Sequence, residues 1–172
     1  MTRRELIRLL PRNGDDLEAA KRIMALGHPM VVPALTEIVQ FMRVAESKVA
    51  DAFADFIATI EDSAVSTLGQ ELGRENCWLR HRVFCIILPR WKLESLLRLR
   101  NVLTMIATQP DAYDNDLRCV ELLAAKGLAD LKWLQDWVEF KDQRWQERNR
   151  HLASAMDTIR KAQHDAPPAS VI

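Results

Sequence analysis

A short apolar phrase recurs in this chain of 172 residues at a spacing of thirty-three positions. It reads Val32-Pro33-Ala34-Leu35 in the first copy and Val65-Ser66-Thr67-Leu68 in the second. Both copies lie in stretches whose apolar residues have helical spacing. A period of this size between helical stretches is typical of an array of stacked helical hairpins. The sequence therefore predicts an all-α fold, and most such arrays bind macromolecules along an extended surface.

Residues that start and end helices divide the chain into about four antiparallel hairpins with end helices. Pro11 and Pro89 end helices, Ser47 and Asn76 are placed to cap them, and glycines such as Gly127 close them. We expect a single domain over residues 1–164 and a disordered tail over 165–172. The expected helices span residues 3–10, 17–26, 30–42, 47–60, 65–72, 78–88, 96–106, 117–124 and 131–138, followed by a capping helix through 145–159.

The segment LGHPMVVPAL, from Leu26 to Leu35, resembles the turn and second-helix start of HEAT repeat proteins, although the second copy has Ser66 in place of the proline. That resemblance implies a right-handed superhelix of hairpins. The whole chain also resembles small bacterial HEAT-like domains of unknown function, which occur beside polymorphic toxins as candidate immunity proteins. This second resemblance implies a non-enzymatic module that binds and neutralises a cognate toxin. It rests on LIRLLPRNGDDLEAAKRIMALG, CWLRHRVFCIILPRW and DAYDNDLRCVELLA.

Composition and local motifs bear on several classes of function. The formal net charge is zero, which argues against nonspecific nucleic-acid binding. No apolar run approaches membrane-spanning length and the start of the chain has no signal-like core, so we expect a cytoplasmic protein. Cys77, Cys85 and Cys119 form no CxxC pair and lie in apolar helical contexts, which predicts reduced, buried thiols.

The neutral total conceals an acidic run over residues 37–71 and a basic run over residues 74–100. Stacked repeats of opposite sign would give a polarised surface that steers a charged protein partner. The alternative is that these charges lie on solvated outer helix faces.

Catalytic and metal-binding patterns are not evident in the sequence. The histidines form no HExxH pair, no glycine-rich phosphate loop occurs, and no nucleophile has a base nearby along the chain. Asp51 and Asp55, one helical turn apart, could share a cation or a proton, or could be two solvated charges. We predict a protein that is not an enzyme and holds neither cofactor nor metal.

Polar residues of the second helices, together with an acidic cluster near residue 114, are the predicted partner-binding residues. The cluster either caps a helix or contacts a basic partner surface. The predicted set is Glu37, Gln40, Arg98, Asn101, Tyr113, Asp114, Asn115 and Asp116.

Aromatic residues suggest further interpretations. Trp133, Trp137 and Phe140 form a stripe that either the terminal helix covers or a partner binds. Trp78 and Trp91, which flank several arginines, have the composition of an interface hot spot, and the alternative for Trp78 is packing in the core. In the stripe of the second hairpin, we expect Phe56 to be central to the core.

Two alternatives to a toxin-binding module stay open. Some HEAT-like proteins bind DNA and remove alkylated bases, and here a basic face could use Arg80, Arg82, Arg98 and Arg100 with Trp78 or Trp91. The zero net charge speaks against this reading. A structural scaffold for host proteins would differ from the toxin-binding module only in its partner.

Overall fold

The computed structural model describes residues 1–111 and 113–165, of which residue 152 and residues 158–165 are described by their backbone alone. The chain divides into two compact units, Met1–Asp130 and the segment from Leu131 onward, and the predicted domain over 1–164 spans both. Every regular element in the described residues is helical and none is a strand, which confirms the all-α class. None of the described helices is long and apolar enough to cross a membrane.

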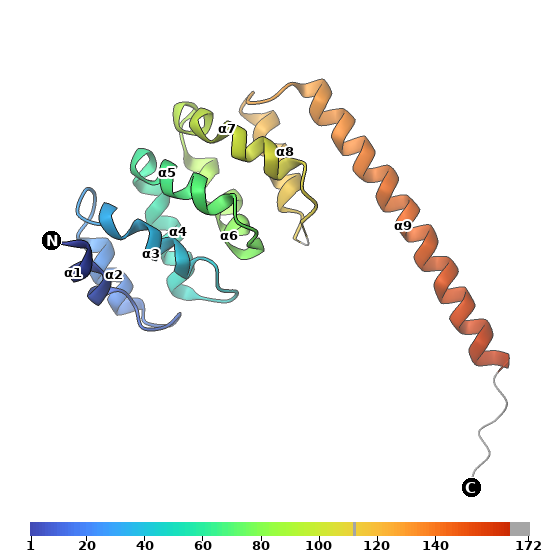
Figure 1. Cartoon of the computed structure of the whole chain (residues 1–172), viewed down its shortest axis with the longest axis horizontal. Helices are drawn as coiled ribbons and strands as arrows, with labels where there is room; N and C mark the ends of the chain where they lie inside the picture. Colours follow the sequence, from blue (N-terminus) through green and yellow to red (C-terminus); the bar gives the residue numbers. More distant parts are fainter. Residues whose placement is uncertain (112, 166–172) are drawn as a thin grey trace, which may run out of the picture. The chain divides into compact units, whose positions relative to one another are not determined.

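The first unit carries eight α-helices with short 3-10 and π segments between them among its described residues (Figure 1). A single helix, α9, follows it. The elements are α1 (Arg3–Leu9), α2 (Leu17–Ala25), η1 (Val32–Ala34), α3 (Leu35–Phe41), α4 (Lys48–Thr59), α5 (Glu61–Leu72), α6 (Cys77–Arg82), η2 (Val83–Ile87), η3 (Leu88–Arg90), α7 (Leu93–Ala107), α8 (Asn115–Ala125) and α9 (Leu131–Asp165).

Helices of the first unit pack in two layers. In one layer α2 contacts α4, α4 contacts η2, and η2 contacts α8. In the other layer α3 contacts α5, and α5 contacts α7. Within each hairpin the two layers meet, as α4 does with α5. We call these the first-helix layer and the second-helix layer, because each hairpin contributes its first helix to one and its second helix to the other.

The starts of the first-layer helices show why the hairpins repeat. Asp16, Ser47 and Asn76 are N-caps, and the side chain of each accepts a hydrogen bond from a backbone N–H in the first turn. Such caps satisfy donors that the helix itself leaves unpaired. The Ser47 hydroxyl also donates to the carbonyl of Gly14, and the Asn76 amide donates to the carbonyl of Arg43, in each case 33 residues back. The same residues therefore start a hairpin and join it to the previous one.

Helix α4 lies in the middle of the core, but the residues on its buried face differ from those predicted. Phe53 and Ile57 are fully buried, and the Phe53 ring meets Phe41 edge-on at 5.7 Å between centroids. Phe56, expected at the centre of the core, is only half-buried. The apolar residues around α4 span a wide arc, and small residues such as Ala50 and Ala54, rather than Phe56, lie against the neighbouring helices. The expected central role of Phe56 was therefore wrong.

The C-terminal segment forms one continuous helix, where the sequence predicted two. Helix α9 runs over 35 residues and contains neither glycine nor proline. Side-chain bonds one turn apart support it, including Lys132 to Asp136 at 3.0 Å and Gln146 to Asp142 at 2.7 Å. Without a residue that breaks the backbone hydrogen bonding, helix propagation continues. The predicted tail over 165–172 lies outside the described residues, apart from Asp165 at the end of α9.

Candidate partner-binding site

Helix α3 holds the first two residues of the predicted partner-binding set. Glu37 pairs with Arg3 of α1. Gln40 is exposed, and its amide donates to a carboxylate oxygen of Glu71 at 3.1 Å. Both side chains therefore link helices within the stack, and Gln40 also remains accessible on the second-helix layer.

The carboxylate of Glu71 is a buried junction between α3 and α5. Its oxygens are held by Arg43, by Gln40 and, at 3.1 Å, by Arg74. Two arginines around one carboxylate leave an excess positive charge there, carried mainly by Arg74, whose side chain is largely exposed. The acidic residue thus serves packing, while its basic partner faces solvent.

Helix α7 holds Arg98 and Asn101, the other pair of the second-helix set. Arg98 lies 3.6 Å from Asp62 of α5, with both side chains exposed. Asn101 is exposed. Leu93 and Leu97 on the same helix are each about half exposed. Residues three and four positions apart are neighbours on a helix surface, so these four side chains form one patch, here called the α7 patch.

The acidic and basic runs of the sequence meet each other where the second and third hairpins pack together. Asp51 of α4 accepts from Arg82 at 2.8 Å, and Asp55 accepts from Arg90 at 2.7 Å. Ser95 donates to Asp62 at 2.9 Å across the same interface. Many charges of the acidic and basic runs therefore neutralise each other between the second and third hairpins, so the surface is less polarised than expected. Asp51 and Asp55 each pair with their own arginine, and their side chains are 61% and 60% exposed.

Arg82 is the most extensively bonded of these arginines. Although only 5% exposed, its guanidinium donates to Asp51 and to three backbone carbonyls. The carbonyls belong to Met42, Val44 and Ala45, at 3.1, 2.8 and 2.7 Å respectively. These carbonyls lie where α3 ends and the connection to α4 begins. Arg82 therefore ties the third hairpin to the link between the first two.

The predicted acidic cluster divides into exposed and buried parts. Asp114 occupies the left-handed region with φ of 54° and precedes α8 without a side-chain capping bond. Asn115 and Asp116 are fully buried, so their side chains lie away from any surface that a partner would contact. Tyr113 is exposed, and its ring lies 4.8 Å from the ring of Trp78 between centroids. Of the cluster, only Tyr113 and Asp114 present side chains to solvent.

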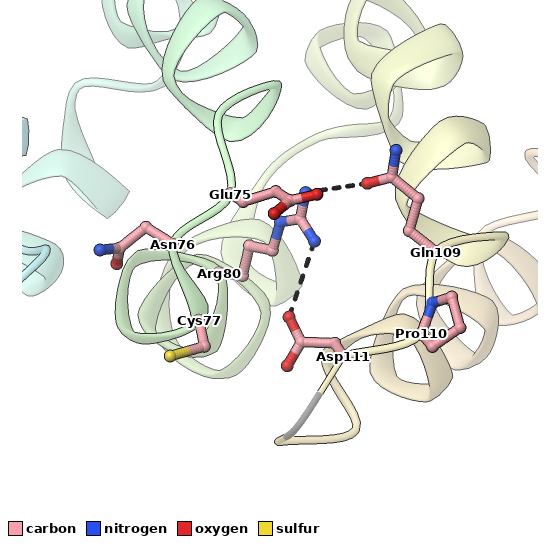
Figure 2. A pocket seen from close by; sticks show the side chains of 7 residues that line it. All are labelled: Glu75, Asn76, Cys77, Arg80, Gln109, Pro110 and Asp111. Atoms are coloured by element: carbon pink, nitrogen blue, oxygen red, sulfur yellow. Dashed lines mark hydrogen bonds and ion pairs between the residues drawn. The ribbon is translucent and has the colours of Figure 1, made fainter.

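A cavity of about 340 Å³ opens between the start of α6 and the α7–α8 loop (Figure 2). At its base the buried Arg80 donates to Gln109 at 3.1 Å and lies 3.6 Å from a carboxylate oxygen of Asp111. The other Asp111 oxygen accepts from the amide of Asn115 and from the backbone of Tyr113, both at 2.9 Å. The lining residues are Glu75, Asn76, Cys77, Arg80, Gln109, Pro110 and Asp111.

The cavity lining has two carboxylates, Glu75 and Asp111, and one cation, Arg80. Its excess negative charge suits a basic group better than an acid. The sequence suggested Arg80 for a basic face and gave residues 109–111 no functional role. The pairing of Arg80 with Asp111 forms only when α6 packs beside the α7–α8 loop, and no local sequence signal reveals it.

The three cysteines lie in different surroundings, which corrects the expectation that all are buried. Cys119 is buried and its thiol donates to the carbonyl of Leu103 at 3.1 Å. Burial raises the pKa of the Cys119 thiol to about 12. Cys77 is half-buried in the cavity wall, and Cys85 is exposed. Cys85 lies in the π segment η2, where the helix is wider than an α-helix, and its side chain reaches solvent there.

Within the described residues, no three histidine, cysteine or acidic side chains are grouped in a way that could hold a metal ion.

Comparison with protein-family models, with curated proteins and with solved structures finds no match to this chain.

Proposed function

We propose that this chain is a HEAT-like, right-handed stack of helical hairpins that binds a protein partner on its second-helix layer. The observation that carries the proposal is the pair of layers, α2–α4–η2–α8 and α3–α5–α7, joined by side-chain bonds between hairpins. Such an arrangement presents one helix per hairpin along a continuous surface. Stacked hairpin proteins use surfaces of this kind to bind other macromolecules.

The α7 patch gives this proposal its chemistry. Leu93 and Leu97 supply exposed apolar area, and Arg98 and Asn101 add directional hydrogen-bond donors beside it. Apolar side chains next to an arginine are frequent at the centre of protein interfaces. An exposed carboxylate on the partner would compete with Asp62 for Arg98, a pair with both side chains in solvent and therefore weakly held.

The most concrete form of the proposal is a cytoplasmic immunity protein that occludes the active site of a cognate bacterial toxin. Its support is the resemblance of LIRLLPRNGDDLEAAKRIMALG and CWLRHRVFCIILPRW to the immunity-associated domains. A patch of mixed apolar and polar side chains suits a protein that acts by covering another. In this form, Gln40, Arg98 and Asn101 contact the toxin directly.

The DNA-binding alternative loses several of the residues on which it rested. Arg80, Arg82 and Trp91 are at most 5% exposed, and both arginines are engaged by acceptors of the protein itself. A basic face for duplex DNA needs cations at the surface, where they can displace counterions. The scaffold alternative shares the binding surface and differs only in the partner.

A co-expression experiment tests the proposal. The immunity function predicts a large toxin gene immediately upstream of the gene for this chain, and expression of that gene alone should arrest growth. Co-expression of this chain should restore growth, and Leu97→Asp in the α7 patch should abolish the protection. Arg118→Glu, an exposed change on α8 in the first-helix layer, is the matched control and should protect like the wild type.

Equal protection by Leu97→Asp and Arg118→Glu would place binding outside the α7 patch. No rescue by the wild type would contradict the immunity function. A gel shift at low salt provides the comparison with the DNA alternative: salt-sensitive binding of duplex DNA at micromolar concentration would favour that alternative instead.

A further inference from the structure

Helix α9 carries an apolar residue at every seventh position. The series begins at Leu131 and continues through Val138, Trp145, Leu152 and Ile159 in the sequence. A straight α-helix drifts by about 20° per seven residues, so an apolar stripe with this spacing stays on one side only if the helix supercoils around another helix. The spacing therefore favours a coiled-coil seam over packing on a globular surface.

The three members of the α9 stripe whose side chains the structure describes face solvent in the single chain. The exposed fraction is 66% for Leu131, 39% for Val138 and 64% for Trp145. The bonds that support the helix, such as Lys132 to Asp136 and Gln146 to Asp142, use other positions and leave the stripe uncovered. Contiguous exposed apolar side chains of this kind are characteristic of an interaction surface.

We propose that α9 binds α9 of a second copy of this chain, in an antiparallel two-helix coil. The second inward-facing position, three residues after each member of the stripe, decides the direction. It holds Leu134, Lys141, Arg148 and Ala155. Leu134 is only 3% exposed and already packs within the single chain, so the seam with a second copy runs over residues 138–155. A parallel pair would place Lys141 against Lys141 of the second copy and Arg148 against its own equivalent. Like charges facing each other in a seam are destabilising.

An antiparallel pair removes both conflicts, because stripe positions then face the second inward position of the other helix. Trp145 lies against Arg148 of the second copy, and Val138 lies against its Ala155. A guanidinium over an indole face is a favourable cation–π contact. The same helix already contains one such contact, because the guanidinium of Arg144 lies 5.1 Å from the centre of the Phe140 ring.

The charge distribution along α9 favours the same direction. Residues 131–147 carry one more acidic than basic residue, and residues 148–165 carry two more basic than acidic residues. Antiparallel association places the acidic half of each helix beside the basic half of the other. Parallel association would place halves of the same net charge beside each other. The resulting repulsion would decrease as salt is added.

Sedimentation equilibrium of the full chain tests the association. The wild type should show a concentration-dependent mass rising from 19.8 kDa toward twice that value. Trp145→Glu should lower the association constant at least tenfold, and Gln146→Glu, one residue away and outside the seam, should leave it within twofold. A wild-type chain that stays monomeric up to about 100 μM overturns the proposal, as does equal association by the two variants.

Disulfide trapping tests the direction. In a background with all three native cysteines replaced, Val138→Cys chains are mixed with Ala155→Cys chains and oxidised. Antiparallel pairing should yield mainly the mixed 138–155 disulfide. Mainly 138–138 and 155–155 products would show a parallel pair and overturn the antiparallel assignment. Circular dichroism of each variant confirms that its helix content is that of the wild type.

Discussion

Replacing Arg82 with methionine is expected to cost far more stability than replacing any exposed arginine of the chain. The change removes one charge and four donated hydrogen bonds, three of them to partly buried backbone carbonyls. Breaking a buried, hydrogen-bonded charge network costs about 3–5 kcal/mol. Asp51 is 61% exposed and regains water, so most of the loss comes from the carbonyls of Met42, Val44 and Ala45.

Two further variants separate this network from simple charge pairing. Arg90→Met removes a pair whose side chains are 54% and 60% exposed, and exposed pairs contribute at most about 1 kcal/mol. Arg82→Lys keeps the charge but cannot span four acceptors, because an ammonium lacks the planar fork of a guanidinium. We expect Arg82→Lys to lie between the other two.

Thermal melts followed by near-ultraviolet circular dichroism measure the effect. For a chain of this size, about 1 kcal/mol shifts Tm by roughly 2–4 °C, so Arg82→Met should lower Tm by about 6–20 °C. Arg90→Met should lower it by less than about 4 °C. Equal Tm values for Arg82→Met and Arg90→Met would show that the connection between α3 and α4 does not depend on Arg82, and would contradict the predicted role of its hydrogen bonds.

Other consequences follow from burial in the first unit. Phe53→Ala should lower the free energy of unfolding by about 3–5 kcal/mol and Phe56→Ala by about 1–2 kcal/mol, both measured by urea denaturation. A larger loss for Phe56→Ala would support the central core position that the sequence predicted for Phe56. At pH 8 a thiol reagent should modify Cys85 in the folded protein and reach Cys119 only after denaturation, and rapid labelling of Cys119 would contradict its burial. The pKa of Cys119 is raised from 9.0 to about 12, so its contribution to stability is complete below pH 9 and declines as pH rises toward 12. Cys119→Ala should remove that part of the pH dependence in denaturation curves recorded from pH 8 to 11.

The starts of three first-layer helices were predictable because their causes are local, whereas other boundaries, such as the expected helix over 30–42 that the structure forms as α3 over Leu35–Phe41, were not. Asp16, Ser47 and Asn76 cap helices through bonds to residues three positions ahead. Gly127 takes a positive φ of 62°, as expected for a residue that closes a helix. The continuity of α9 had a local signal as well, since residues 131–165 contain no glycine or proline, and its apolar spacing alone gave no reason for a break.

The polar contacts between hairpins were not predictable in the same way. Arg82 meets Asp51 across 31 residues, and Arg80 meets Asp111 across the same separation. A charge run in the sequence looks the same whether it faces water or a neighbouring hairpin of opposite sign. Which of these occurs depends on the rotation of each helix about its axis, which is set by packing. The cavity at Arg80 and the neutralisation of the charged runs depend on that rotation.

Arg82 also bears on whether the second-helix layer can act as one binding surface. In a hairpin stack stabilised only between neighbours, a single hairpin can open without the rest. Arg82 of the third hairpin donates to Asp51 in the second and to the carbonyl of Met42 where the first ends. Opening the third hairpin therefore removes the donor and leaves acceptors in both other hairpins unpaired. This link raises the cost of local opening and favours unfolding as a unit. A surface that is already ordered loses less conformational entropy on binding, which increases affinity without any additional contact.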